Sequence, residues 1–107
     1  MVGNYIPISS WAEDDKPREK MLLKGVAALS TNELLAILIR SGSGGESALD
    51  LSRRILTDAS NDLNVLARLS VSDFMNRYKG VGMAKAASII AAMELGRRRA
   101  LSTAREE

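Results

Sequence analysis

Residues 78–86 have the sequence YKGVGMAKA, and the expected fold is built outward from this stretch. Two glycines, Gly80 and Gly82, flank one apolar residue, Val81, and helical patterns lie on both sides. Glycine adopts backbone angles that other residues avoid, and it lets a second backbone approach closely. We therefore predict a tight turn between two helices, in which Val81 points inward and fixes the hairpin.

The helix that follows this turn is predicted to present its N-terminus outward. The first N–H groups of a helix have no intrahelical partner, and the helix dipole is positive at this end, so both features suit an anion. The predicted phosphate-binding residues are Lys79, Gly80, Val81, Gly82, Met83, Ala84 and Lys85. The alternative is a helical hairpin that is used only for packing.

The charge distribution favours an anionic partner. The chain has a net charge of +2, but residues 77–99 contain six basic residues and one acidic residue. A basic patch of this kind is typical of proteins that bind nucleic acids. Arg97 and Arg98 belong to the patch, and we expect them to contact a neighbouring strand or to form a linker. The alternative is a solvated helix end, where cations are favourable because of the helix dipole.

The rest of the chain is predicted to be helical as well. No segment shows sustained alternation of apolar and polar residues, so the fold class is all-α, a compact bundle of five to six short helices. The expected helices cover residues 15–24, 30–39, 47–59, 61–69, 70–78 and 83–101. In the third of these helices one apolar stripe is predicted, and in the last one a buried inner face: Ala48, Leu51, Ile55 and Ala59, and Ala86, Ile89, Ile90 and Met93, respectively.

Side-chain caps support three of these helices. Ser30 and Glu33 form a capping box before a strongly apolar helix, which is therefore expected at the centre of the fold. Asn61 is predicted to cap the next short helix, and Ser70 the one after it, with Asp73 as a poorer partner at the third position.

The amino-terminal region is expected to differ from the rest. Pro7 disfavours helix in its surroundings, so residues 5–8 are predicted to be extended. We expect an arm over residues 1–15, a helical domain over residues 16–101, and a tail or linker over residues 102–107. Residues 21–23 are expected to face the core. Residues 24–26 repeat the Lys-Gly-Val of residues 79–81 and predict a degenerate second hairpin with a structural role.

Several classes of function are excluded by composition. The 107 residues include no cysteine and no histidine, which excludes disulfides, zinc sites with Cys or His ligands, and Ser-His or Cys-His catalysis. No apolar run is long enough to span a membrane, and no signal peptide opens the chain, so a cytoplasmic location without membrane contact is expected. We expect no cofactor and no metal site.

Enzymatic activity is not expected either. The acidic residues 13–15 lie together without a partnering base. Residues 42–45 are rich in glycine, but no lysine follows them and no strand precedes them, so they do not form a nucleotide-binding P-loop. Contact between this loop and DNA is left open.

Four short sequence motifs (boxes) of this chain resemble those of the RadC family, which is associated with DNA repair. Residues 15–22 (DKPREKML), 29–42 (LSTNELLAILIRSG), 80–86 (GVGMAKA) and 94–98 (ELGRR) match the family's boxes in order. Residues 78–87 also resemble the helix-hairpin-helix motif, which binds the DNA backbone without reading bases. A lysine at position 16, where the family often has arginine, is a small departure.

The resemblance implies a domain fragment. RadC-like proteins continue into a JAB/MPN-type domain with a histidine-containing metal site, so this chain resembles their amino-terminal portion alone. It is then expected to be a non-enzymatic, non-sequence-specific DNA-binding domain, whose partners are duplex or branched DNA and that C-terminal domain. The alternative function is a helical interaction or dimerisation module that positions the metal-dependent hydrolase domain.

Overall fold

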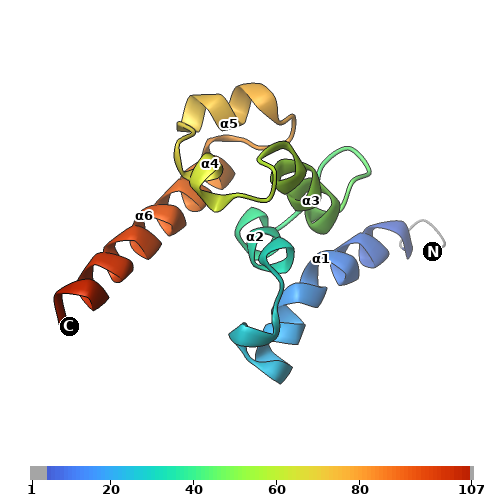
Figure 1. The fold of residues 1–107 in the computed structure, drawn as a ribbon. Coiled ribbons are helices and arrows are strands. Elements are labelled where there is room, and N and C mark those ends of the chain that lie inside the picture. The colour runs from blue at the N-terminus through green and yellow to red at the C-terminus, as the bar shows by residue number, and fades with distance from the viewer. Residues whose placement is uncertain (1–4, 107) are drawn as a thin grey trace.

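The computed structural model describes the backbone of residues 5–106 and the side chains of residues 13–102. Six α-helices and one short 3₁₀ helix make up this part of the chain, and its backbone forms no strand (Figure 1). The elements are α1 (Tyr5–Lys24), η2 (Val26–Ala28), α2 (Thr31–Ile39), α3 (Ala48–Asp58), α4 (Leu63–Ala67), α5 (Val71–Arg77) and α6 (Met83–Glu106). The predicted all-α class is confirmed.

Helix α2 lies at the centre of the fold, as its apolar composition predicts. It packs against α1, α3 and α6, and α6 in turn packs against α4 and α5. Leu35, Ala36 and Ile39 on α2 are buried. A helix that contacts neighbours on three sides needs apolar residues around most of its surface.

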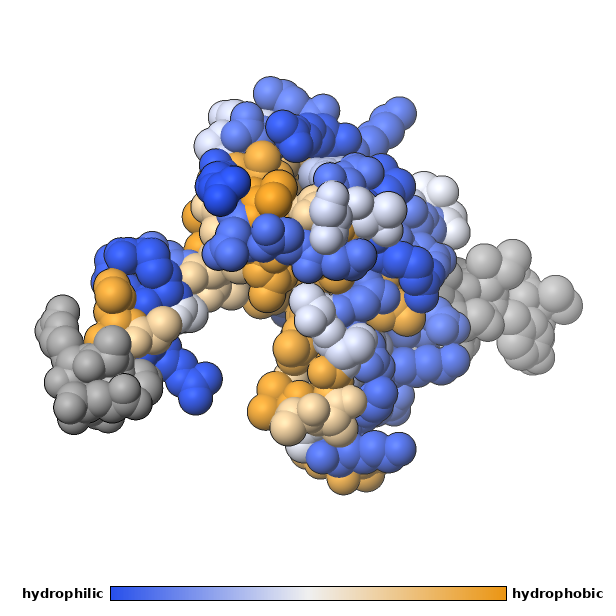
Figure 2. Space-filling model, viewed as in Figure 1, coloured by the Kyte–Doolittle hydropathy of each residue, from blue (hydrophilic) through white to orange (hydrophobic). Residues whose placement is uncertain are grey.

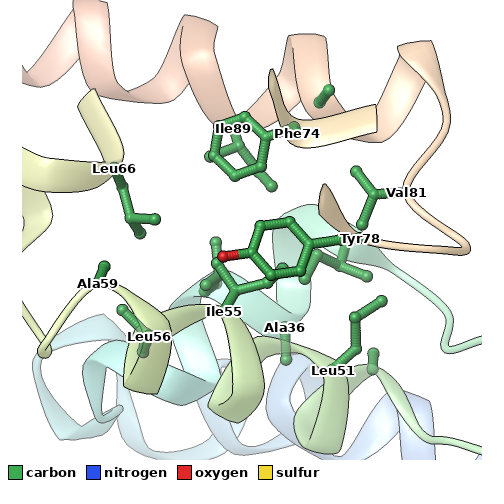
Figure 3. Close-up of a cluster of buried hydrophobic side chains, with 14 residues drawn as sticks. Ala36, Leu51, Ile55, Leu56, Ala59, Leu66, Phe74, Tyr78, Val81 and Ile89 are labelled. Carbon is green, nitrogen blue, oxygen red and sulfur yellow. The ribbon is translucent and has the colours of Figure 1, made fainter. Parts of the chain in front are cut away.

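The main core is formed where α3 and α6 pack against α2 and where α5 packs against α6. The predicted stripe of α3 is buried, and so are Ala86 and Ile89 on the predicted inner face of α6. Figure 3 shows Tyr78 in the middle of this cluster, with its ring centroid 6.1 Å from that of Phe74. Burial of each large apolar side chain contributes roughly 1.5–3 kcal/mol. This core holds the end of α5 against the start of α6.

The capping predictions are confirmed at two helices and corrected at a third. Ser30 with Glu33 and Ser70 with Asp73 both form reciprocal capping boxes. Asn61 is not the cap of α4, because its φ of 57° places it in the left-handed region. Asp62 instead accepts a hydrogen bond from the α4 backbone, because it is the residue with extended backbone angles directly before the helix.

The extended conformation predicted for residues 5–8 is wrong, because α1 begins at Tyr5 and not at Asp15. Pro7 lies in the first turn of the helix, where a backbone N–H has no intrahelical partner to lose. The helix also continues through Pro17, whose side chain is buried. That burial offsets part of the cost of the missing backbone hydrogen bond.

The segment between α1 and α2 differs from its sequence repeat at residues 79–81. Val26 is 58% exposed, whereas Val81 is 3% exposed. Leu22 and Leu23 were expected to face the core, but they are 86% and 80% exposed. Figure 2 shows apolar surface at this end of α1. The prediction of inward-facing leucines is therefore wrong, since no described element packs over this end of α1.

Helix α6 extends past its predicted end at residue 101 and reaches Glu106. One face of its N-terminal half, at Ala86 and Ile89, is buried in the core, whereas the residues from Leu95 to Ser102 are exposed. Figure 1 shows the second half of the helix projecting away from the other elements. The predicted phosphate-binding turn lies at the core end of α6, and the arginines at positions 97–99 lie on the projecting half.

Candidate nucleic-acid interface

The corner between α5 and α6 is a tight turn held by the core. Tyr78 is the residue directly after α5, and the N–H of Val81 donates to the Tyr78 carbonyl at 3.1 Å. Gly80 has a φ of 93°, which a residue with a Cβ rarely adopts. Val81 is buried, so the prediction that it points inward is confirmed.

The two glycines of the corner have different roles. A Cβ atom on Gly80 would lie 2.4 Å from the Cβ of Ser43, so both its φ and its surroundings require glycine. Gly82 does not have a positive φ, and a Cβ atom there would have no neighbour within 4 Å. The expectation that both glycines adopt special backbone angles is therefore wrong for Gly82. Gly82 is instead the residue directly before α6, and its carbonyl accepts the first helical hydrogen bond, from Ala86, at 3.0 Å.

Helix α6 begins without a side-chain cap. At α2, α3, α4 and α5 the preceding residue is a serine or an aspartate whose side chain accepts a hydrogen bond from the helix backbone. Gly82 has no side chain for this purpose. Among the hydrogen bonds of the described residues, none uses the N–H groups of Met83 or Ala84, and both residues are exposed. These amides therefore lack an acceptor within the described part of the chain and belong to surface residues.

The two predicted lysines have different environments. Lys79 is exposed at the turn. Lys85 is half-buried, and its Nζ donates to the carbonyl oxygen of Ser41, after the end of α2, at 2.8 Å. One of its three N–H donors is therefore already used inside the molecule, and Lys79 is the more accessible charge.

Arg97 and Arg98 do not join the corner. At roughly 1.5 Å per residue, Arg97 lies about 20 Å along the helix from Ala84. Both guanidinium groups donate to the carboxylate of Glu94, at 2.7 to 3.0 Å, and these bonds lower the pKa of Glu94 to about 2. Glu94 therefore stays ionised at neutral pH and offsets part of the positive charge predicted here.

Arg40 is brought close to the corner by the fold. It caps the C-terminus of α2 with a φ of 74° and is exposed. With Lys85, Ala84 and Ser88 it lines a hollow of about 350 Å³ beside the start of α6. Arg40 lies far from the hairpin in the sequence, so local motifs gave no signal that it belongs to this surface.

The glycine-rich loop forms a tight turn on an acidic surface. Gly44 and Gly45 both have positive φ values, and the N–H of Glu46 donates to the Ser43 carbonyl at 3.0 Å. The loop borders a hollow of about 700 Å³ whose charged residues are Glu13, Asp14, Glu46, Asp50 and Arg53. A surface with four carboxylates and one guanidinium is unfavourable for a phosphate, so this side of the loop is a poor DNA contact.

Residues 13–102, whose side chains are described, contain no group of three carboxylate, histidine or cysteine ligands that could hold a metal ion. None of the helices within residues 5–106 combines the length and the apolar composition needed to cross a bilayer.

Comparison of the sequence with known proteins identifies one protein family that includes the residues of the corner. A protein-family model described as "UPF0758 N-terminal" matches residues 8–87. A UPF0758 protein of Flavobacterium johnsoniae is 59% identical over 98 residues, which cover 92% of this chain and 42% of the relative. A UPF0758 protein of Trichlorobacter lovleyi is 47% identical over 93 residues, or 85% of this chain and 40% of the relative. No solved structure matches.

The chain thus spans about two fifths of the length of these relatives. The matched residues 8–87 run from α1 to the first turn of α6 and include the corner, Arg40 and the glycine-rich loop. Since this match covers most of the chain, the protein belongs to the UPF0758 family and carries its N-terminal domain.

Proposed function

We propose that this domain binds DNA without sequence specificity, by holding a backbone phosphate at the α5–α6 corner. On this proposal the corner is a helix-hairpin-helix of the RadC type, and the domain acts in the cytoplasm as a non-enzymatic part of a DNA repair-associated protein. The uncapped start of α6 is the observation that carries the proposal. Its exposed amides at Met83 and Ala84 contrast with four helix starts that use their own side chains.

The charges around these amides support a phosphate ligand. Lys79 and Arg40 are exposed beside the corner, and Lys85 adds a third positive charge at the first turn of α6. Backbone amides and lysines bind a phosphate through its oxygens and charge, which carry no information on base identity. Low sequence specificity follows from this chemistry.

The proposal is tested most sharply at Gly82, because space is open around its Cα. In Gly82→Asp, the new carboxylate accepts a hydrogen bond from the first turn of α6 and occupies the proposed phosphate position. Compared with glycine, an aspartate at this N-cap raises helix stability by roughly a few tenths of a kcal/mol, and its negative charge favours the same end of the helix. The variant is therefore expected to be more stable than the wild type and to lose most of its DNA affinity.

Gly82→Ala is the matched control, since it adds a Cβ without a cap or a charge. Its DNA affinity should stay within a few-fold of the wild type, measured by fluorescence anisotropy with linear and branched duplexes. If Gly82→Asp binds DNA as tightly as Gly82→Ala does, the phosphate does not lie at this corner.

A protein-interaction module that positions a following hydrolase domain is the second candidate. The inner residues of the apolar helix α2 are buried in the core and are therefore not a surface for such an interface. The exposed apolar patch of Leu22, Leu23 and Val26, at the C-terminal end of α1, is the observation that favours this candidate. A Leu22→Gln variant, which adds no charge, distinguishes the two functions by light scattering and DNA binding. It should disrupt self-association or docking and leave DNA affinity unchanged.

A further inference from the structure

The loop between α2 and α3, residues 40–47, contacts the α5–α6 corner at two places. The Nζ of Lys85 donates to the Ser41 carbonyl at 2.8 Å. The Cβ and Oγ of Ser43 would lie 2.4 and 2.6 Å from a Cβ on Gly80, so the serine fills the space beside that glycine. The position of this loop therefore affects the positions of both Gly80 and Lys85 in the corner.

The loop is itself folded tightly and depends on its glycines. A Cβ on Gly42 would lie 1.6 Å from the carbonyl oxygen of Glu46, so the two ends of the loop touch through backbone atoms. Such a loop loses much conformational entropy when it orders, because its glycines are highly flexible in the unfolded chain. Besides its contacts with the corner, an anchor from a further element helps to hold it in one conformation.

Asp14 on α1 supplies this anchor. Its Oδ1 accepts from the N–H of Ala48 at 2.8 Å, and its Oδ2 accepts from the N–H of Gly42 at 3.4 Å. One carboxylate thus joins the beginning of the loop to its end, at the start of α3. The neighbouring acidic residues behave differently, since among the described side chains Glu13 pairs with Lys16 and Asp15 with Arg18, on the same helix.

We propose that Asp14 is a positioning residue for the phosphate-binding corner, acting through residues 40–47. The carboxylate holds the loop, the loop holds Gly80 and Lys85, and these residues set the orientation of the exposed amides of α6. Asp14 makes no contact with the ligand. The consequence for DNA affinity rests on the proposed function, whereas the effect on the order of the corner does not.

The experiment compares Asp14→Ala with Glu13→Ala, because both variants remove one negative charge from adjacent positions. Loss of a carboxylate alone should strengthen binding to a polyanion slightly. If Asp14 positions the corner, Asp14→Ala instead binds DNA about three- to tenfold more weakly than Glu13→Ala. Asp14→Asn, whose amide oxygen still accepts from Ala48, should recover most of the difference.

Amide hydrogen exchange gives a readout that does not need DNA. In Asp14→Ala, exchange at the Val81 amide, which closes the corner, should become at least about tenfold faster relative to exchange at Ile55 in α3. In Glu13→Ala this ratio should stay at the wild-type value. If Asp14→Ala does not fold, Asp14→Glu replaces it, since its longer side chain moves the carboxylate away from both amides.

The two proposals fail in different ways. If the wild type does not bind DNA, the proposed function is wrong, and the exchange ratio alone decides the role of Asp14. If the ratio in Asp14→Ala equals that of the wild type, or if Glu13→Ala changes it equally, Asp14 does not position the corner.

Discussion

The ammonium group of Lys85 donates a 2.8 Å hydrogen bond to the carbonyl of Ser41 and thereby joins the start of α6 to the end of α2. The lysine that sequence motifs single out as a phosphate ligand therefore also serves the fold. Lys79, on the outer side of the turn, makes no such hydrogen bond in the described structure and is exposed. The two lysines of the motif should respond differently to substitution.

The first prediction concerns Lys79 and its matched control, Lys24. Both precede a Gly-Val pair, but only Lys79 lies beside the uncapped start of α6. For the wild type, log affinity for duplex DNA should fall with log salt with a slope of about −3 to −4.5, the value for three to five neutralised phosphates. Lys79→Ala should reduce the magnitude of this slope by about 1, and Lys24→Ala should leave it unchanged. A wild-type affinity that does not depend on salt would contradict the phosphate contact itself.

The second prediction concerns Gly80. Its φ of 93° and the nearby Ser43 both oppose a side chain, so Gly80→Ala should lower the free energy of unfolding. The left-handed backbone alone costs roughly 1–2 kcal/mol, and the contact with Ser43 adds to it. Urea denaturation measures the loss. In a Ser43→Gly background the cost of Gly80→Ala should shrink towards the backbone value, and equal costs in the two backgrounds would show that Ser43 does not crowd this position.

The third prediction uses the two Lys-Gly-Val segments as matched sites. Val81 is 3% exposed and Val26 is 58% exposed. Val81→Ala should lower the free energy of unfolding by about 1–3 kcal/mol, because it leaves a cavity in the core. Val26→Ala should change it by less than about 0.5 kcal/mol. Similar losses at the two sites would mean that the first segment is a packed hairpin after all.

These two segments also show what a sequence can predict here. The caps at Ser30 and Ser70 and the stripe on α3 were predictable, because they depend on residues within one or two helical turns. The burial of Val81 but not Val26 depends on which helices pack over each turn, and the three-residue pattern is the same in both. Local sequence therefore predicts the turn and not its environment.

The candidate site was predictable to the same extent. The residues of the corner form a continuous motif, and the structure keeps them together. The packing of α2 brings Arg40 to the corner, and the packing of α1 brings Asp14 to the loop that supports it. Arg97 and Arg98 lie far from the corner because α6 is long. Contacts between distant segments, and the end of an exposed helix, have no comparable local signal.

The fourth prediction concerns acid stability. Hydrogen bonds from the capping serines lower the pKa of two carboxyls: chiefly the Ser30 backbone for Glu33, helped by Lys20, and chiefly the Ser70 backbone for Asp73. A carboxyl whose pKa is lower in the folded state than in the unfolded state stabilises the fold above its unfolded pKa, which is about 4. That contribution is lost as the pH falls through the folded pKa. The urea midpoint should therefore decrease from about pH 5 downwards and stay nearly constant between about pH 6 and 8, since the chain has no histidine. Glu33→Gln should have a lower midpoint at neutral pH and a shallower decrease in acid, whereas a decrease as steep as that of the wild type would show that the Glu33 cap does not contribute to stability.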